Sequence, residues 1–135
     1  MKWLPLVILT LMITSAPARD YGQYADLDPK QKQWFREQKV PGGTNGETCC
    51  NEADGTFAEE DIRDGQYWTR YRPKTWSKNP ITNKMTAREG ELTAWEPVPP
   101  NALLDTPNHN GLAVVWYYYN NGKLTIRCFA PGVKM

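Results

Sequence analysis

The sequence predicts a small α+β domain: an amino-terminal helix packed on a mainly antiparallel β-sheet that ends in a β-hairpin and is stapled by a disulfide. Three observations lead to this prediction. A capped helical segment begins at residue 29, two strand-like runs flank an Asn-Gly turn near the carboxyl end, and three cysteines follow an export-like start. The 135 residues leave room for one compact core.

The first eighteen residues have the three-part form of a secretory signal peptide. Met1-Lys2 is basic, residues 3–14 are apolar, and residues 15–18 are small with an A-x-A spacing, which predicts cleavage after Ala18. The apolar run of about twelve residues is too short for the roughly twenty that span a bilayer. We therefore expect residues 19–135 to form one periplasmic or secreted domain, with no membrane span after cleavage.

The charge of the mature chain argues against a nucleic-acid partner. Removing Lys2 leaves fifteen basic and fifteen acidic residues, with no long run of either sign. A surface that follows phosphate groups needs clustered Lys or Arg, so we expect no nucleic acid to bind.

Aliphatic residues are few, and the aromatic rings, which bury about 150–250 Å² each, are expected to build the core.

The clearest element is a helix over residues 29–39. Asp28 can accept a main-chain hydrogen bond at the cap position, and Pro29 suits the first helical turn. Residues 40–43, Val-Pro-Gly-Gly, end the helix. Its narrow apolar stripe consists mainly of Trp34 and Phe35.

The polar region after the helix contains two short candidate elements. Residues 57–62 fit either a strand or a single helical turn, and residues 66–71 alternate as a strand. The two sides of that strand are Tyr67, Thr69 and Tyr71 on one and Trp68 and Arg70 on the other.

The next region is less regular. Residues 72–90 are long, basic and irregular, and we expect them to form a mobile loop. Residues 91–96 are expected to form a short strand that ends at the prolines of residues 97–100, at a sheet edge. Residues 101–104 fit one turn.

The strongest β signal is the final hairpin, residues 112–119 and 124–129. Asn121-Gly122 suits a two-residue type I′ turn, whose central residues need positive φ. With Asn120 opposite Lys123, alternation gives two faces. The expected core face pairs Tyr119 with Leu124, Tyr117 with Ile126 and Val115 with Cys128. The outward face pairs Tyr118 with Thr125, Trp116 with Arg127 and Val114 with Phe129.

The three cysteines, Cys49, Cys50 and Cys128, are interpreted as a structural disulfide with one thiol left over. Neighbouring cysteines seldom bond to each other because the small ring strains the peptide between them. Cys128 is therefore expected to pair with either Cys49 or Cys50. Closing this long loop would stabilise the fold by roughly 4.5 kcal/mol on the chain-entropy model.

Reactive roles of these residues compete with this interpretation. The three cysteines with His109 would form a zinc set, but the C-x₂₋₄-C spacing is absent, so no metal or cofactor is expected. A thiol of Cys49 or Cys50 could act with His109. The cluster Glu59-Glu60-Asp61 could cleave a glycosidic bond or be only a solvated turn. We expect no catalytic residue among them.

The outward face of the final hairpin is the candidate ligand-binding surface. Trp116, Tyr118 and Arg127 would lie side by side there, with Arg127 placed for a cation–π contact with Trp116. Such a platform stacks on sugar rings or on a protein partner. In the alternative interpretation, the helix covers this face through Trp34 and Phe35.

Several short motifs occur together between residues 33 and 132. They are Trp34-Phe35, Pro41-Gly42, Cys49-Cys50, Ala53-Asp54-Gly55, Pro97-Val98-Pro99, Gly111 to Trp116, and Ile126 to Phe129 before Pro131-Gly132. This set resembles a group of uncharacterised small exported proteins of rhizobia-like alphaproteobacteria and their phages. The resemblance implies export, a disulfide-bonded β domain that shares the Cys128 bond, and no assigned activity or catalytic residues.

These observations predict an exported, disulfide-stabilised and non-enzymatic binding module for an envelope glycan or a protein partner. One alternative is a small hydrolase or thiol enzyme that uses Cys49 or Cys50 with His109, or the 59–61 cluster. Another is an inhibitor of a secreted enzyme.

Overall fold

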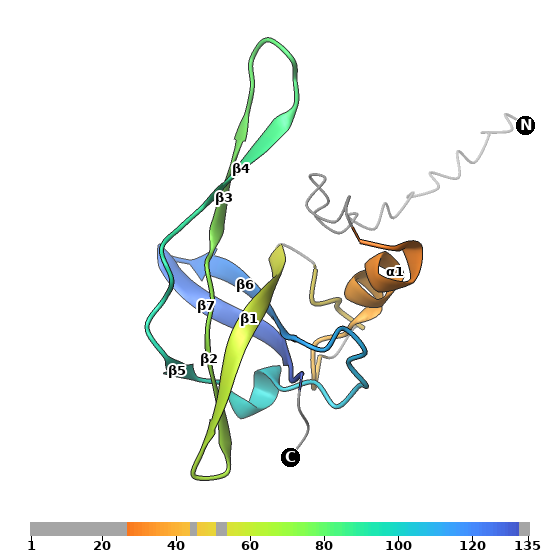
Figure 1. Ribbon diagram of the computed structural model, residues 1–135, viewed down its shortest axis with the longest axis vertical. Helices are drawn as coiled ribbons and strands as arrows, with labels where there is room; N and C mark the ends of the chain where they lie inside the picture. The colour runs from red at the N-terminus through yellow and green to blue at the C-terminus, as the bar shows by residue number, and fades with distance from the viewer. Residues whose placement is uncertain (1–26, 44–45, 51–53, 133–135) are drawn as a thin grey trace, which may run out of the picture.

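The computed structural model describes residues 27–43, 46–50 and 54–132 (Figure 1). The predicted signal peptide, residues 1–18, lies outside these residues. The described chain contains one α-helix beside two antiparallel sheets, so the α+β prediction is confirmed only in the coarser form of a mostly β chain with a single helix. No helix in the described ranges is long and apolar enough to cross a membrane.

The elements follow one another along the chain as α1 (Pro29–Glu37), β1 (Asp54–Arg63), β2 (Gln66–Arg70), β3 (Lys74–Lys78), β4 (Met85–Glu89), β5 (Glu96–Pro97), the 3₁₀ turn η1 (Pro100–Ala102), β6 (Ala113–Asn120) and β7 (Lys123–Ala130). Five of the strands form one sheet in the order β5-β2-β1-β6-β7, and β3 and β4 form a separate two-stranded sheet. Every pair of neighbouring strands is antiparallel.

Helix α1 begins where the sequence predicts. The side chain of Asp28 accepts a hydrogen bond from the main-chain N–H of Gln31 at 2.9 Å, and Pro29 occupies the first turn. The helix ends at Glu37, two residues before the expected end, because Gln38 is already extended. Trp34 attaches the helix to the rest of the domain, since its indole N–H donates to the carbonyl of Pro107 at 3.0 Å.

The five-stranded sheet curls because one segment connects its two edges. β5 pairs with β2 through Trp68 and Pro97, and seven residues later the N–H of Leu104 donates to the carbonyl of Phe129 on β7 at 2.8 Å. η1 lies between these two contacts, which confirms the expected turn near residues 101–104. The segment of residues 96–104 thus closes one side of the curled sheet (Figure 1).

The final hairpin is confirmed at its tip. Asn121 and Gly122 have φ values of 50° and 77°, and the predicted pairing holds from Asn120↔Lys123 to Tyr117↔Ile126. A β-bulge then shifts the register, so that Trp116 lies opposite Cys128 rather than Arg127. The predicted pairs beyond Tyr117 are therefore wrong, because Arg127 is an extra residue on β7 that alternation alone does not reveal.

β6 is buried on both faces, and each face belongs to a different apolar cluster. On one face Val114 and Trp116 join the helix-side cluster with Phe35, Cys49, Cys50, Leu104, Cys128 and Ala130. On the other face Ala113, Val115 and Tyr117 join the inner cluster with Tyr67, Tyr71, Val98, Ala102, Ile126 and Phe129. The bulge moves Cys128 to the helix side and Phe129 to the inner side, opposite to the expected assignment.

The disulfide joins Cys49 to Cys128, with their Cα atoms 5.8 Å apart. This confirms the predicted staple and resolves which of the two neighbouring cysteines takes part. Cys49 is also held through its main chain, because its N–H donates to the carbonyl of Gln38 at 2.8 Å. The bond therefore fastens the segment after the helix to the last strand of the sheet.

The middle of the chain is more regular than the sequence predicts. Residues 57–62 belong to strand β1, which settles the choice between strand and helical turn, and residues 66–70 form the expected strand β2. The prediction of an irregular loop over residues 72–90 is wrong, because this segment forms the β3–β4 hairpin. The predicted strand over residues 91–96 is also wrong, since only Glu96 and Pro97 form an edge strand there.

The contribution of the Cys49–Cys128 disulfide to stability can be measured by removing or reducing the bond. Replacing both Cys49 and Cys128 by Ala releases a loop closed over 79 residues, and we expect a loss of about 2–4 kcal/mol in the free energy of unfolding. Dithiothreitol should lower the Tm of the wild type and of Cys50→Ala, but not that of the double variant. Equal Tm values for the wild type with and without reductant would contradict this role.

Candidate functional site

The predicted binding platform on the final hairpin is not exposed. Trp116 is fully buried, and its ring lies 5.8 Å from that of Trp34 and 5.7 Å from that of Phe35, measured between ring centroids. Tyr118 packs beside them and is half-buried. The interpretation in which the helix covers this face through Trp34 and Phe35 is therefore confirmed, and Trp116 is not available as a binding platform.

Arg127 contacts a loop instead of the Trp116 ring. Its guanidinium donates to the carbonyl of Thr48 at 3.3 Å and to the carboxylate of Glu47, also at 3.3 Å. Both partners precede Cys49 in the chain. The side chain thus fastens the disulfide-bearing loop to β7, and no ligand-binding role follows from its position.

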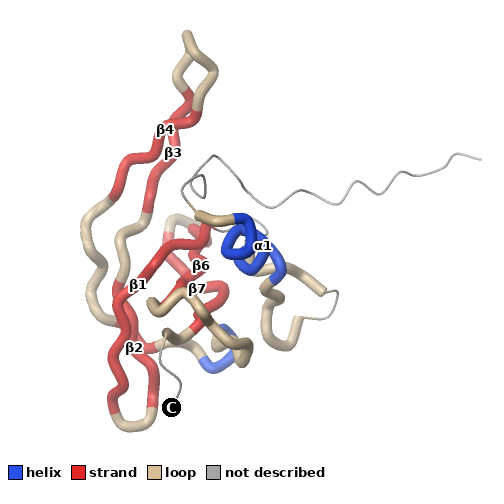
Figure 2. Tube along the Cα trace, turned by 45° about the vertical axis from the view of Figure 1, so that its right-hand side comes forward, coloured by secondary structure: helices blue, strands red, loops and turns tan. Residues whose placement is uncertain are grey.

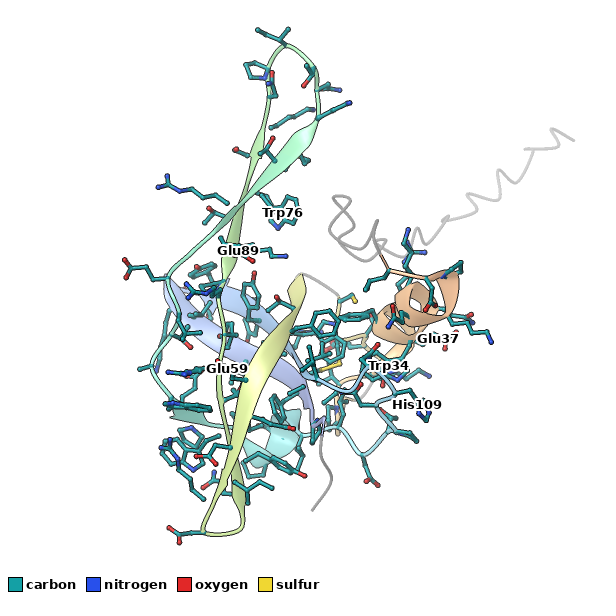
Figure 3. The ribbon with its side chains drawn as sticks, in the orientation of Figure 1. Trp34, Glu37, Glu59, Trp76, Glu89 and His109 are labelled. Atoms are coloured by element: carbon teal, nitrogen blue, oxygen red, sulfur yellow. A yellow bond between two sulfur atoms is a disulfide. The ribbon has the colours of Figure 1, made fainter. Side chains whose placement is uncertain are left out.

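The cysteines and His109 are not arranged as a catalytic pair. Cys49 is oxidised in the disulfide, and Cys50 is fully buried, with its thiol donating to the carbonyl of Phe35 at 3.0 Å. His109 is exposed on the loop after η1, beside the helix (Figure 3). Within the described ranges no three His, Cys, Asp or Glu side chains converge to hold a metal ion.

The carboxylates of the 59–61 cluster are divided between the two faces of β1. Glu59 pairs with Arg70, and Asp61 pairs with Arg63 at 3.0 Å. Glu60 accepts the main-chain N–H of Gly132 at 3.0 Å. The hydrogen bond from Arg63 lowers the pKa of Asp61, whereas a glycosidase acid needs a raised pKa.

The face of the β1–β2 hairpin that carries Glu59 and Asp61 also holds arginine side chains packed against tryptophan rings. This cluster was not predicted from the sequence. The guanidinium of Arg63 lies 4.9 Å from the ring centroid of Trp68 and 5.2 Å from that of Trp95, and Arg70 lies 4.7 Å from that of Trp95. We call these four residues the Trp–Arg cluster. The alternation of Trp68 and Arg70 along β2 was visible in the sequence, but Trp95 comes from a distant segment.

The largest departure from a compact shape is the β3–β4 hairpin, which we call the arm (residues 74–89). It stands away from the curled sheet in both views (Figures 1 and 2). Its five residue pairs run from Lys74↔Glu89 to Lys78↔Met85, and both strands pair only with each other. Figure 3 shows Trp76 on the arm and Glu89 at its root.

Two hydrogen bonds define the root of the arm, one to a core side chain and one between the two flanks of the arm. The phenol oxygen of Tyr117 on β6 accepts the N–H of Lys74 at 2.6 Å, and the N–H of Gly90 donates to the carbonyl of Pro73 at 2.7 Å. A Cβ atom at residue 90 would lie 2.8 Å from that carbonyl oxygen, so only glycine fits. These contacts explain why the segment is an ordered extension of the domain.

The tip of the arm, residues 79–84, is held by hydrogen bonds to a single residue. The N–H of Asn79 donates to the carbonyl of Lys84 at 2.8 Å, and the side chain of Asn79 accepts from the N–H groups of Ile81 at 2.8 Å and Thr82 at 3.2 Å. This arrangement leaves the Ile81 side chain 91% exposed. An apolar group is thus presented on a defined turn.

The segment that contains the arm, residues 72–90, also concentrates positive charge. Residues 72–90 hold five of the sixteen Lys and Arg residues and one of the fifteen acidic residues, so the segment has four excess positive charges and the remaining chain three excess negative charges. None of these five cations forms an ion pair within the described part of the chain. By contrast, Arg63, Arg70 and Arg127 on the sheet each bind a carboxylate.

A pocket of about 400 Å³, which we call the slot, lies where the arm leaves the sheet. β1 residues 56–59 line one side, and residues 70–72 and 74 line the other. Glu89, Leu92 and Leu112 complete it. Phe57 and Leu112 are 39% and 57% exposed, so apolar and cationic groups meet at this opening.

A second pocket, of about 370 Å³, contains Glu96 and Lys123 between β5 and the start of β7. Burial raises the pKa of Glu96, and the charge of Lys123 opposes this rise. Burial and the nearby charge of Glu96 also raise the pKa of Tyr71, so its hydroxyl stays protonated. Nothing in the sequence pattern distinguished Glu96 from the other carboxylates.

No model of a known protein family matches the chain, and no curated protein or solved structure is significantly similar to it.

Two buried tyrosines provide a matched test of how the arm is anchored. Tyr117→Phe leaves the Lys74 N–H without its acceptor, and we expect a loss of about 1 kcal/mol in unfolding free energy and faster amide exchange in the arm. Tyr71→Phe should cost nothing, because its hydroxyl has no hydrogen-bond partner in the described chain. Equal amide exchange in both variants would show that Tyr117 does not anchor the arm.

The raised pKa of Glu96 predicts a specific pH dependence of stability. A carboxyl whose pKa is raised on folding is fully tolerated below its ordinary value of 4.5 and destabilises the fold as the pH rises through the folded pKa. Glu96→Gln should therefore match the wild type in urea unfolding near pH 4 and exceed it at pH 7. Glu91→Gln, at an exposed carboxylate, is the control and should not show this gain at pH 7. An unfolding free energy of Glu96→Gln below that of the wild type at pH 7 would contradict the burial effect.

Proposed function

We propose that the protein is exported and acts as a non-enzymatic binding module that recognises a partner protein through the tip of the arm. The single observation that carries this proposal is the order of the tip around an almost fully exposed Ile81. Neither cluster of the core includes a residue of the arm, so packing of the core does not require this hairpin.

A fixed apolar tip suits protein recognition for an energetic reason. Burying an isoleucine side chain in a partner contributes about 1.5–3 kcal/mol. Because Asn79 already holds the turn, little conformational entropy is lost when the tip binds. The unpaired cations beside the tip, Lys78 and Lys84, would add attraction to an acidic rim.

The positions of Trp116, Trp68 and Trp95 favour a protein over a glycan as the partner. Sugar recognition by stacking needs an open ring face. Trp116 is buried, and guanidinium groups lie over the rings of Trp68 and Trp95. The exposed apolar group at the tip is instead an aliphatic side chain, which binds in a protein pocket.

Two further features support export and a non-enzymatic role. A disulfide persists in the oxidising compartments to which the predicted signal peptide of residues 1–18 would lead. Four of the groups considered for catalysis are engaged elsewhere: Cys49 in the disulfide, the Cys50 thiol at the Phe35 carbonyl, and Glu59 and Asp61 in ion pairs.

Site-specific photocrosslinking in cells that produce the protein tests this proposal. A photoreactive phenylalanine replaces Ile81 at the tip in one variant and Ile62, which is 43% exposed on β1, in the matched control. We expect one discrete protein adduct from position 81 and none from position 62. The intact mass of the recovered chain should match a chain that begins at Arg19.

Three outcomes would contradict the proposal. They are the same adducts from both positions, no adduct from position 81, and an adduct from position 81 that is removed by glycan-degrading enzymes. A recovered chain that keeps residues 1–18 would contradict export. An adduct with a secreted enzyme would identify the module as an inhibitor of that enzyme.

A further inference from the structure

The slot at the root of the arm exposes the main chain of one strand. β1 pairs with β2 only from Arg63↔Gln66 to Glu59↔Arg70, and with β6 only from Asp54↔Tyr117 to Ala58↔Ala113. Beyond Arg70 the chain turns away toward the arm. Among the described residues, the β2-facing edge of β1 therefore has no neighbouring strand next to residues 56–58.

The register shows which groups face this gap. Asp64 and Gly65, with φ values of 51° and 74°, form a two-residue turn, and in such a hairpin the closing pair, Arg63 and Gln66, exchanges main-chain hydrogen bonds. Alternate residues of β1 therefore point their N–H and C=O groups to the β2 side. That alternation continues through Glu59 to Phe57.

Phe57 thus directs a main-chain donor and acceptor into the slot. Pairing with β6 uses the opposite edge of β1, and no main-chain bond from a turn or loop of the described chain reaches Phe57. Arg72 would face Phe57 if β2 continued in the same register, but the pairing of the two strands ends at Glu59↔Arg70. The edge of β1 is open at Phe57 because the chain after Arg70 leaves the sheet and continues into the arm.

The chemistry around this edge specifies a ligand. Arg72, Lys74 and Glu89 line the slot without ion pairs in the described chain, and Glu59 is bound to Arg70, so the lining keeps one excess positive charge. The exposed rings and chains of Phe57 and Leu112 lie at the same opening. A volume of about 400 Å³ falls in the range of ligand pockets, about 300–1,000 Å³.

We propose that the slot binds an extended acidic and apolar peptide segment of a protein, which adds to β1 as a short strand beside Phe57. Main-chain hydrogen bonds to Phe57 would set its position, as in other cases of strand addition. An apolar side chain of the segment would contact Phe57 and Leu112, and a carboxylate would face Arg72 and Lys74. This site does not depend on the tip of the arm binding a partner.

Titration of the ¹⁵N-labelled full chain with a defined probe tests the proposal. The probe is the blocked peptide acetyl-Val-Glu-Val-Glu-Val-amide, and its counterpart with Lys in place of Glu is the charge control. We expect shifts confined to residues 56–58, 70–74 and 112, with slower exchange of the Phe57 amide. Binding should weaken as salt is added.

Charge-reversal variants separate the slot from the tip. Arg72→Glu with Lys74→Glu should weaken binding of the acidic peptide about tenfold, while Lys78→Glu with Lys84→Glu, which changes net charge equally, should change it less than about twofold. No shift at millimolar peptide, equal binding of the lysine peptide, or shifts centred on the tip would overturn the proposal. None of these results would show whether the tip of the arm binds a partner, which the crosslinking at position 81 tests separately.

Discussion

The structure depends on burial of β6 on both faces. Trp116 points to the helix and the disulfide, and the next residue, Tyr117, points to the inner cluster and the root of the arm. One strand therefore connects the helix, the staple, the curled sheet and the arm. Because the two side chains are adjacent, displacing one would move the other, and the position of the arm follows from the packing of the core.

This coupling gives the arm its functional meaning. A hairpin that leaves the domain needs a fixed root if its tip is to bind with little entropic cost. The phenol of Tyr117 and the close approach of Gly90 to Pro73 supply that root, and Asn79 orders the tip. The same departure of the chain from β2 leaves the edge of β1 open at Phe57. The tip and the slot are thus two consequences of one topological feature.

The elements with strong local signals could be predicted from the sequence. Asp28 and Pro29 marked the helix, and Asn121-Gly122 marked the final turn. The bulge at Arg127 could not be read from alternation, because the extra residue is stabilised by a distant partner, Glu47.

The arm was missed because its strands are short and polar and bury little surface, so they lack a clear period of two. Trp116 was assigned to an outward face because alternation along β6 does not show that helix α1 covers this face.

The most direct test of this account is ¹⁵N relaxation of the backbone. If the arm is an ordered extension held by β6, residues 74–78 and 85–89 should have order parameters close to those of residues 113–117, about 0.85. Order parameters below about 0.6 in the arm, with rigid values in β6, would contradict the central claim. The segment would then be a flexible loop, and its tip could not act as a fixed docking element.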